Sequence, residues 1–471
     1  MADAGKPTRS PSSVLWTVIT AVLVIVLVVV LLQRLGVIGG VPLDVQVAST
    51  LTGSTPTQEP TSKNIKAYVD KDDPSVKIDT LPKSKWKIID IHEHAQFEEE
   101  AVRMLKAMDE FGVQRTCLQA ATIYTYTLNN KYGFEQYKEN NEEIIRIKNK
   151  WPDRFCAFVT IDPAEAGNLD LLKDYFARGA DGIKLYLGHG AATGKGPFHV
   201  MDLDDPRMDE IWTWAEDAQV PILLHVNLIK YWDEMISVFE KHPHLRICLP
   251  HFGLHKNTEA RLNRLGWILD RYPNVYTDLS YGYYTFQIEG FESLAKWRTR
   301  SRDWLTRHAD RVMFASDMVL EKTKDEAYIE NTLRSYRQFN EMRAFRLFLV
   351  PSRLMHGMGL DDDTLAKMYE QAPKNFLLLD AAGNLPDRKK SLRVDVPRTS
   401  LPPIDLASIP DDVQYKPRSK GQTWASPKTL ARALAAQGGE ESGNGFAGDK
   451  PSQGANGESI PDDEGAEHEC H

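Results

Sequence analysis

The sequence predicts an α/β protein whose central region closes into a (β/α)₈ barrel, the TIM-barrel architecture. Two observations support this fold. Short apolar runs alternate with stretches whose apolar residues recur at helical spacing, and the alternation repeats eight times between Lys85 and about Ala382. Several of the apolar runs also end in His or Asp, as expected where barrel strands open onto their C-terminal mouth.

The predicted strands are short runs rich in β-branched and other apolar residues. In chain order they are Lys87–His94, Val113–Ala121, Arg154–Asp162, Gly182–Tyr186, Pro221–His225, Arg246–His251, Asn274–Ser280 and Arg311–Asp317. Apolar residues at helical spacing predict helices over Glu98–Phe111 and Glu143–Lys150. Strand, helix and strand in this order indicate parallel strands with helices outside them.

Polar side chains gather at the ends of the predicted strands. The first strand ends in His92 and His94, and positions i and i+2 of a strand project to the same face. Three further strands end in His225, His251 and Asp317. A single such histidine is typical of a hydrogen-bonded core residue. Four strand ends that carry His or Asp instead predict a metal site at the barrel mouth.

Composition places the chain among globular proteins and argues against nucleic-acid binding. Its 471 residues are 42% hydrophobic and 26% charged, and the formal net charge is −9. Residues Gly439–His471 hold nine acidic residues and one lysine, so the rest of the chain is close to neutral. No basic patch therefore predicts a nucleic-acid partner.

The N-terminal region predicts a membrane anchor. Val14–Leu32 is a run of 19 uncharged residues, long enough to cross a bilayer as one helix. A signal peptide is the alternative, but its apolar region is usually shorter and an Ala-x-Ala cleavage site usually follows promptly. Lys6 and Arg9 precede the run and only Arg34 follows closely. This bias predicts a single-pass protein with a cytoplasmic N-terminus and an extracytoplasmic barrel.

We therefore divide the chain into five parts. Residues 1–13 are a cytoplasmic N-terminus, 14–32 the transmembrane helix and 33–84 a linker. Residues 85–385 are the barrel, and 386–471 are a Pro/Gly-rich, acidic, largely disordered tail. Cys117, Cys156 and Cys248 lie in apolar runs without CxxC spacing, which predicts small core residues rather than a disulfide framework.

The strand ends carry motifs that together resemble a known family. The motifs are DIHEH (90–94), GADGIKLY (179–186), VPILLHV (220–226), RICLPHFG (246–253) and RVMFASDM (311–318), with a closing helix over Leu360–Leu379. With them the chain resembles the amidohydrolase superfamily, and within it the amidohydrolase-related family (amidohydrolase family 2), which includes metal-dependent decarboxylases. The resemblance covers roughly Lys85 to Asp380 and implies the barrel fold.

The resemblance assigns His92, His94, His225 and Asp317 to a metal ion. Imidazole and carboxylate ligands suit Zn²⁺, with Mn²⁺ or iron as alternatives. Asp317 would also accept a proton from the attacking water. His251 would orient that water or stabilise charge on a substrate oxygen, or would instead hydrogen-bond a ligand.

Lys184, inside the fourth strand, leaves the number of metals open. In two-metal relatives a lysine at this position carries a bridging carbamate, and His225 with His251 would complete the ligands of the second metal. In single-metal relatives the lysine would contact substrate. The resemblance favours one ion over two.

The function expected from this resemblance is metal-dependent hydrolysis of a C–N, ester or lactone bond. A non-oxidative decarboxylase and a non-catalytic ligand-binding barrel are the alternatives. Tyr186, Tyr281 and Tyr283 would favour a ring-shaped small molecule if they face the metal, or else cover apolar edges. An anionic group of the substrate could be held by His189 and His255. A homo-oligomer is compatible with the sequence.

Overall fold

The computed structural model describes residues 81–122, 134–187, 202–228, 231–253, 258–282, 284–347, 354–398, 400–403 and 410. The chain divides into two units, Met1–Ile65 and Lys66–His471, and every described residue belongs to the second. The proposed membrane span at residues 14–32 lies outside the described residues and stays a prediction. Among the helices that the structure describes, none has the length and apolar character to cross a membrane.

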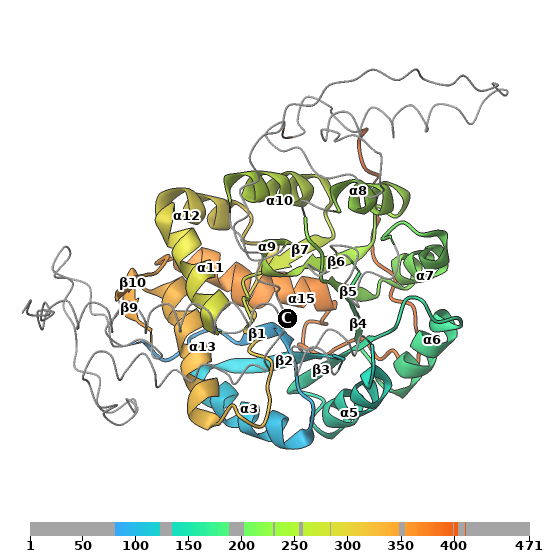
Figure 1. The fold of residues 1–471 in the computed structure, drawn as a ribbon, viewed down its shortest axis with the longest axis horizontal. Helices are drawn as coiled ribbons and strands as arrows, with labels where there is room; N and C mark the ends of the chain where they lie inside the picture. Colours follow the sequence, from blue (N-terminus) through green and yellow to red (C-terminus); the bar gives the residue numbers. More distant parts are fainter. Residues whose placement is uncertain are drawn as a thin grey trace, which may run out of the picture. The chain divides into compact units, whose positions relative to one another are not determined.

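Eight parallel strands follow one another around a barrel in the order of the chain (Figure 1). They are β1 (Ile88–Glu93), β2 (Val113–Gln119), β3 (Phe155–Thr160), β4 (Gly182–Leu185), β5 (Pro221–Leu224), β6 (Arg246–Leu249), β7 (Val275–Asp278) and β8 (Val312–Met313). The backbone amide of Ile91 donates to Phe314 O at 3.0 Å, and Ala95 forms a parallel bridge with Leu320. These contacts join the last strand to the first, so the barrel is nearly closed.

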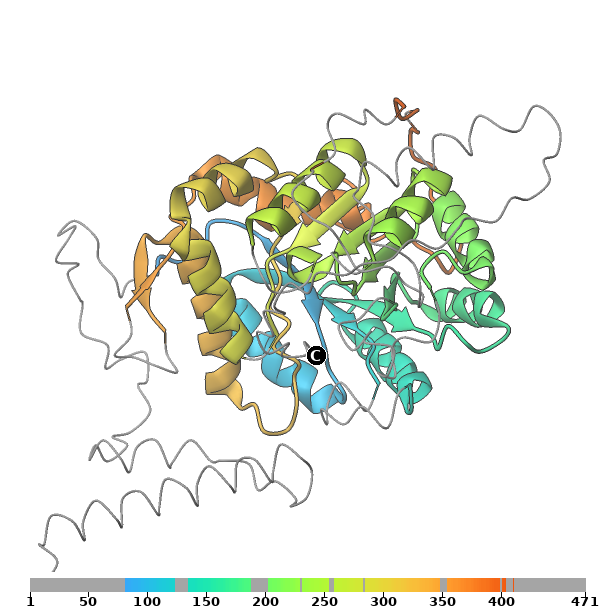
Figure 2. The same ribbon diagram turned by 45° about the horizontal axis from the view of Figure 1, so that its top comes forward.

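Helices surround the strands, as Figures 1 and 2 show from two directions. They are α3 (Glu98–Phe111), α5 (Tyr137–Lys150), α6 (Asn168–Arg178), η1 (Pro206–Met208), α7 (Asp209–Ala218), α8 (Trp232–Lys241), α9 (Pro250–Gly253), α10 (Glu259–Arg271), α11 (Tyr284–Lys296), α12 (Arg298–Arg307) and α13 (Glu326–Glu341). Each amphipathic helix buries its apolar residues against the strands, which confirms the predicted (β/α)₈ barrel.

All eight predicted strands are present, while the last part of the domain is more irregular than predicted. The closing helix is divided into α14 (Asp362–Ala366), a π-helical turn η2 (Lys367–Gln371) and α15 (Ala372–Leu377). Pro373 lies at the start of α15 and has no N–H to donate to the preceding turn, which accompanies this break. A short antiparallel pair, β9 (Ala344–Arg346) and β10 (Leu354–His356), was not predicted.

The barrel interior below the strand ends is filled with apolar side chains. These interior side chains alternate along the strands with side chains that face the helices. The interior residues of the strands are Ile89, Ile91, Cys117, Cys156, Phe158, Leu223, Cys248, Tyr276, Met313 and Ala315. Phe376 of α15 packs against this cluster, with ring centroids 6.3 Å from Phe158 and 5.2 Å from Tyr276. The polar strand ends therefore stand above a dry interior.

The first residues of the predicted tail pack on the barrel. Arg388 is buried, and its guanidinium donates to the carbonyl oxygens of Ala218 (3.0 Å) and Gln219 (2.7 Å) at the end of α7. Further on, Arg271 donates to Pro402 O at 3.0 Å. The described chain after residue 385 thus continues along the domain. The remaining tail lies outside the described residues.

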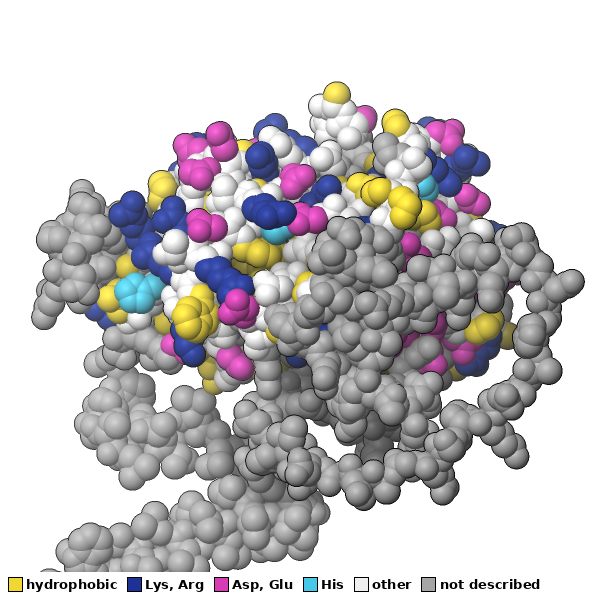
Figure 3. Space-filling model, turned by 90° about the horizontal axis from the view of Figure 1, so that it is seen from above, with side chains coloured by type: hydrophobic (Ala, Val, Ile, Leu, Met, Phe, Trp, Pro, Cys, Tyr) yellow, Lys and Arg dark blue, Asp and Glu magenta, His cyan; other side chains and the backbone are white. Residues whose placement is uncertain are grey.

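Charges of both signs are interspersed on the described surface. On the face shown in Figure 3, Lys and Arg side chains alternate with Asp and Glu, and hydrophobic side chains are scattered between them. This mixture agrees with the near-neutral balance of the chain before its acidic end.

One prediction about the cysteines was wrong. Cys117 and Cys156 are both buried in the interior, as predicted, but they form a disulfide. The two residues are register partners on neighbouring strands β2 and β3, with Cα atoms 4.4 Å apart. Paired residues of parallel strands point to the same side of the sheet, so register alone brings the two sulfurs together. Cys248 is free and buried.

We expect the double change Cys117→Ala and Cys156→Ala to lower the free energy of unfolding by about 2–4 kcal/mol, because the bridge restricts the unfolded chain. Denaturant titration measures this loss. Unfolding the unaltered protein in the presence of a reductant should reproduce most of this loss in the free energy of unfolding.

Cys248→Ala is the matched control, since Cys248 is buried in the same interior and is free. This variant should respond to a reductant as the unaltered protein does. An unaltered protein whose unfolding midpoint is the same with and without reductant would contradict the bridge.

Candidate metal centre

Two imidazoles come from the end of β1 and one from the end of β6. His92 is in β1 and His94 follows it, and their ring centroids are 5.3 Å apart. His251 follows β6, and its ring lies 5.1 Å from that of His92. All three are at most 2% exposed. The imidazoles of His92 and His94 therefore lie close together at the end of β1, as their i, i+2 spacing predicts.

Hydrogen bonds fix which nitrogen of each ring carries the proton. The Nδ1 atoms of His94 and His251 lie 2.8 Å and 2.9 Å from the carbonyl oxygens of Gln119 and Ser280. A carbonyl oxygen can only accept, so each Nδ1 must be the donor. His92 Nδ1 lies 3.0 Å from the carboxylate of Asp278 in the same way. The lone pair of each neutral ring is therefore on Nε2.

The three Nε2 atoms converge on one carboxylate. Asp317 Oδ1 lies 3.4 Å from His92 Nε2 and 3.4 Å from His94 Nε2, and Asp317 Oδ2 lies 3.4 Å from His251 Nε2. Asp317 is 1% exposed, and within the described part of the chain neither of its oxygens has a hydrogen-bond donor. Acceptors that face acceptors in a buried space repel one another unless a cation or a proton lies between them.

Burial keeps the imidazoles neutral. Burial, followed by the positive charge of Lys184, lowers the pKa of His92 to about 3. Burial also lowers the pKa of His251 to about 4 and that of His94 well below its usual value. Neutral imidazole is the form that binds a metal ion.

Burial of Asp317 disfavours the ionised form of its carboxyl group more than the neighbouring Lys184 favours that form. Burial raises its pKa well above the usual value, and the charges of Glu93 and Asp278 raise it further, whereas Lys184 lowers it. Paired charge favours an ionised carboxylate, so a cation beside Asp317 would oppose the effect of burial.

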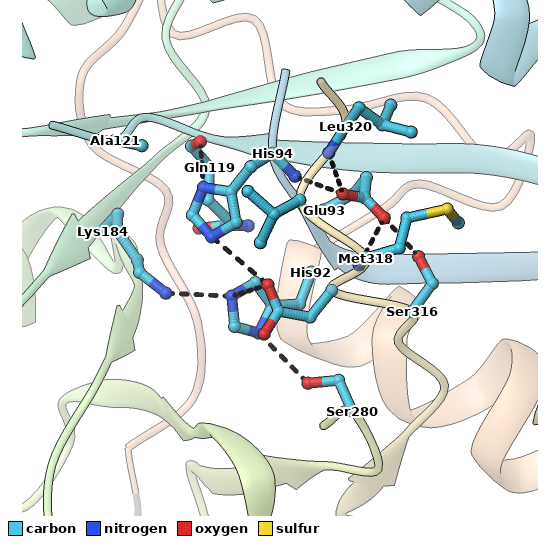
Figure 4. Close-up of polar contacts among 12 residues, drawn as sticks. His92, Glu93, His94, Gln119, Ala121, Lys184, Ser280, Ser316, Met318 and Leu320 are labelled. Carbon is cyan, nitrogen blue, oxygen red and sulfur yellow. Dashed lines mark hydrogen bonds and ion pairs between the residues drawn. The ribbon is translucent and has the colours of Figure 1, made fainter. Parts of the chain in front are cut away.

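Lys184 is the charged neighbour of this cluster. Its Nζ lies 2.9 Å from His92 Nε2, and Figure 4 shows the side chain reaching from β4 toward that ring. Burial lowers the pKa of Lys184 to about 8, and the charge of Asp317 opposes that shift. Lys184 thus lies where the sequence placed it, within reach of His92.

Asp278 at the end of β7 is a functional residue that the sequence analysis missed. Its Oδ2 accepts from His92 Nδ1, while Oδ1 accepts from the amides of His251 (2.9 Å) and Ser280 (3.1 Å). Burial raises the pKa of Asp278, but the hydrogen bond and charge of His92 lower it below its usual value. An aspartate at a strand end was the available signal. A carboxylate behind a metal-binding histidine fixes its tautomer and orientation.

The described ligand atoms form two groups within 4.8 Å of one another: His92, His94 and Asp317, and His92, His251 and Asp278. His225 belongs to neither group, although it follows β5 and its ring lies 5.0 Å from that of His251. Its assignment as a ligand stays a prediction.

Two of the site loops have strained backbones. Among non-glycine residues with positive φ are His251 (57°), Phe252 (54°), Asp317 (41°) and Val319 (52°). Such conformations are uncommon outside glycine and concentrate at functional sites, where surrounding contacts hold them. The strain therefore falls on the two strand ends that carry His251 and Asp317.

The predicted substrate-binding residues are only partly described. The Tyr186 hydroxyl donates to Ala120 O at 3.0 Å, and the Tyr281 ring packs on Phe291 with centroids 5.8 Å apart. Both tyrosines are buried, which agrees with their alternative role of covering apolar neighbours. The other three, His189, Tyr283 and His255, lie outside the described residues.

The donor set fits a divalent metal ion. Neutral imidazole nitrogens and one carboxylate face a common point, and the orphaned oxygens of Asp317 have no other described partner. Imidazole and carboxylate ligands suit zinc and also admit manganese or iron. His92, His94 and Asp317 are the residues that would hold such an ion.

A protein-family model matches the barrel of this chain. The family model named amidohydrolase matches residues 89–379, more than half of the 471-residue chain. The comparison with curated proteins gave no match.

Several solved structures are similar to this chain. A probable 2-pyrone-4,6-dicarboxylic acid hydrolase from Acinetobacter baumannii has 12% identity and a TM-score of 0.44, over 62% of this chain and 99% of its own. A 2,6-dihydroxybenzoate decarboxylase from Rhizobium has 17% identity and a TM-score of 0.35, over 61% and 98%. A 4-oxalomesaconate hydratase from Rhodopseudomonas palustris has 16% identity and a TM-score of 0.39, over 61% and 95%.

We expect Asp278→Asn to weaken metal binding about 10–100-fold without unfolding the barrel. The amide must turn its NH₂ group toward His92 Nδ1 or toward the amides of His251 and Ser280, all of which are donors. Competition with a chelator measures the metal affinity, and circular dichroism measures the fold.

Asp181→Asn is the control for loss of a buried carboxylate. Asp181 precedes β4 at the other end of the barrel, accepts from the Ala157 amide at 3.0 Å and pairs with Lys148. Its change should leave metal affinity unaltered. Equal metal affinity in Asp278→Asn and the unaltered protein would show that Asp278 does not support His92.

Proposed function

The chain belongs to the amidohydrolase family, and from this premise we propose that it is a metal-dependent hydrolase acting on a C–N, ester or lactone bond of a small molecule. The observation that carries the proposal is the convergence of the Nε2 atoms of His92, His94 and His251 on the carboxylate of Asp317, which has no hydrogen-bond donor among the described residues. Burying such a group of acceptors costs desolvation and repulsion, and a bound metal ion would reduce that cost.

The residues around the centre have separate roles in this proposal. A divalent metal, when bound, would supply Lewis acidity and bring the pKa of a water molecule to about 7. Asp317 would accept the proton of the attacking water, since its oxygens have no described donor that would compete. His251 would orient that water as an acceptor, because its Nδ1–H is committed to Ser280 O and its lone pair is on Nε2.

One zinc ion is the proposed cofactor. The cluster of His92, His94 and Asp317 offers two imidazoles and one carboxylate, the ligand types of catalytic zinc sites with an open position. Lys184 Nζ is 2.9 Å from His92 Nε2, and an uncarbamylated amino group there has no oxygens with which to bridge two ions, which favours a single ion. In the two-metal alternative Lys184 would carry a carbamate.

We propose that the barrel lies outside the cytoplasm, tethered by residues 14–32. The 19-residue uncharged run and the basic residues before it support this topology. The buried Cys117–Cys156 disulfide adds support, because such bridges form and persist in oxidising compartments.

We expect His92→Ala and Asp317→Asn to lower the metal content, and Asp317→Asn to lower kcat/KM by about 10²–10⁴-fold through loss of the general base. The measurements are metal analysis of the purified protein and a screen of ester, lactone, amide and carboxylated aromatic compounds. The unaltered protein should hold one equivalent of metal. His356→Ala, on exposed β10, should leave metal content and rate unchanged.

Other results would redirect the proposal. Release of carbon dioxide from a carboxylated compound, with no hydrolysis in the screen, would show a decarboxylase. Metal binding without turnover of any compound would favour a ligand-binding barrel. Two equivalents of zinc, reduced to one in Lys184→Ala, would contradict the single-metal centre, and full metal content in His92→Ala and Asp317→Asn would contradict the ligand assignment.

We expect a reporter fused after Arg34 to be active outside the cytoplasm, because Lys6 and Arg9 precede the apolar run and only Arg34 follows closely. Paired reporters that are active on one side of the membrane only measure this orientation. Changing Lys6 and Arg9 to Glu should weaken the preference. A cytoplasmic signal from the unaltered N-terminal region would reverse the topology.

A further inference from the structure

The loop after β8 holds Asp317 in a conformation that its own sequence does not favour. Asp317 and Val319 have φ values of 41° and 52°, in the left-handed region. Branching at Cβ makes this region especially unfavourable for valine. Contacts from elsewhere in the fold must therefore hold the loop from Ser316 to Leu320.

Glu93, between His92 and His94, supplies three of these contacts. Its Oε2 accepts from the Met318 amide at 3.0 Å and lies 2.7 Å from Ser316 Oγ. Its Oε1 accepts from the amides of His94 (2.8 Å) and Leu320 (3.3 Å). Figure 4 shows the Glu93 carboxylate between the His94 amide and the loop residues Ser316, Met318 and Leu320. The side chain is 0% exposed.

Two other buried groups complete the support. Asp90 of β1 accepts from the Ser316 amide at 3.1 Å and lies 2.5 Å from Ser316 Oγ. Lys324 donates to the carbonyl oxygens of Met318 and Val319, the latter at 2.8 Å. The amides of Ser316 and Met318 therefore donate to β1 carboxylates, and the carbonyl oxygens of Met318 and Val319 accept from Lys324.

The contacts of β1 with the loop also join ligands to one another. The Asp317 amide donates to His92 O at 2.7 Å, and the Leu320 amide donates to His94 O at 2.9 Å. Glu93 lies between these two main-chain bonds and reaches the amides of Met318 and Leu320, one on each side of Val319. A shift of its carboxylate would therefore move Asp317 relative to both imidazoles.

We propose that Glu93 is a positioning residue: its carboxylate holds the β8 loop in the left-handed conformation that aims Asp317 at the Nε2 atoms of His92 and His94. The inference rests on the proposed metal centre. Glu93 does not serve as a ligand itself, because both of its oxygens are occupied by protein donors. It acts on the metal through Asp317.

The test is the metal affinity of Glu93→Gln, measured with zinc against a competing chelator in the purified full-length protein. Each oxygen of Glu93 accepts from a main-chain amide, so either orientation of the glutamine places an NH₂ group against an N–H donor. We expect zinc affinity to fall about 10–100-fold. Added to Asp317→Asn, the same change should cost little more, because its effect passes through Asp317.

Glu100→Gln is the matched control. Glu100 is 1% exposed and accepts from the amides of Gln96 (2.6 Å) and Phe97 (3.0 Å) at the start of α3, away from Asp317. Both amides donate to Oε2, so a glutamine can keep both hydrogen bonds, and this variant should leave zinc affinity unchanged. If Glu93→Gln does not fold, Lys324→Met removes the donors to the Met318 and Val319 carbonyls and should weaken zinc binding in the same way.

The outcomes separate the two proposals. One outcome would overturn the role of Glu93 and leave the metal centre standing. In that outcome the unaltered protein binds zinc, and Glu93→Gln, or Lys324→Met where it replaces that variant, binds zinc with equal affinity. If Glu93→Gln lowers zinc affinity by the same factor with and without Asp317→Asn, Glu93 has a general structural role, and its role as a positioning residue is overturned too. An unaltered protein that binds no zinc would instead refute the metal centre and this role with it.

Discussion

The site depends on one unfavourable arrangement, the burial of the Asp317 carboxylate against imidazole nitrogens that can only accept hydrogen bonds. Hydrogen bonds at Nδ1 leave the lone pairs of His92, His94 and His251 on the Nε2 atoms, 3.4 Å from Asp317. In a medium of low polarisability this arrangement is costly without a cation. The fold must therefore stabilise the arrangement from outside, and much of the surrounding polar structure does so.

The barrel provides that stability in two ways. Its lower interior is closed by apolar side chains and by Phe376 of α15, which supply burial energy without competing polar groups. Around the site, buried carboxylates and one lysine are each committed to neighbouring groups. Asp278 accepts from the imidazole of His92, while Glu93 and Lys324 hold the loop that carries Asp317. Because these groups are hydrogen-bonded, their burial costs less and they fix side-chain directions.

Much of this could be predicted from the sequence, because strand periodicity and strand ends are local properties. The i, i+2 spacing of His92 and His94 and the aspartate that ends the eighth run were enough to place them at one mouth. Asp278 obeys the same rule, but the apolar run continues to Ser280, so the sequence does not show that the strand ends at Asp278. Glu93 was not predictable, since its importance depends on a loop more than 200 residues away. The Cys117–Cys156 bridge likewise depends on strand register, which the sequence does not show.

The position of the centre at the seam of the barrel connects its chemistry to folding. His92 and His94 come from the first strand and Asp317 from the last, so these groups meet only after β8 has closed on β1. Bringing the ends of such a long segment together costs chain entropy, and the strained loop at Asp317 adds to that cost. A cation that binds only the closed barrel would stabilise it by mass action and so offset part of the chain-entropy cost and of the loop strain. Glu93 contributes to the same closure without a metal, because its hydrogen bonds also cross from β1 to the β8 loop. The residues that aim Asp317 are thus also residues that close the barrel, which explains why so many buried carboxylates gather at this one seam.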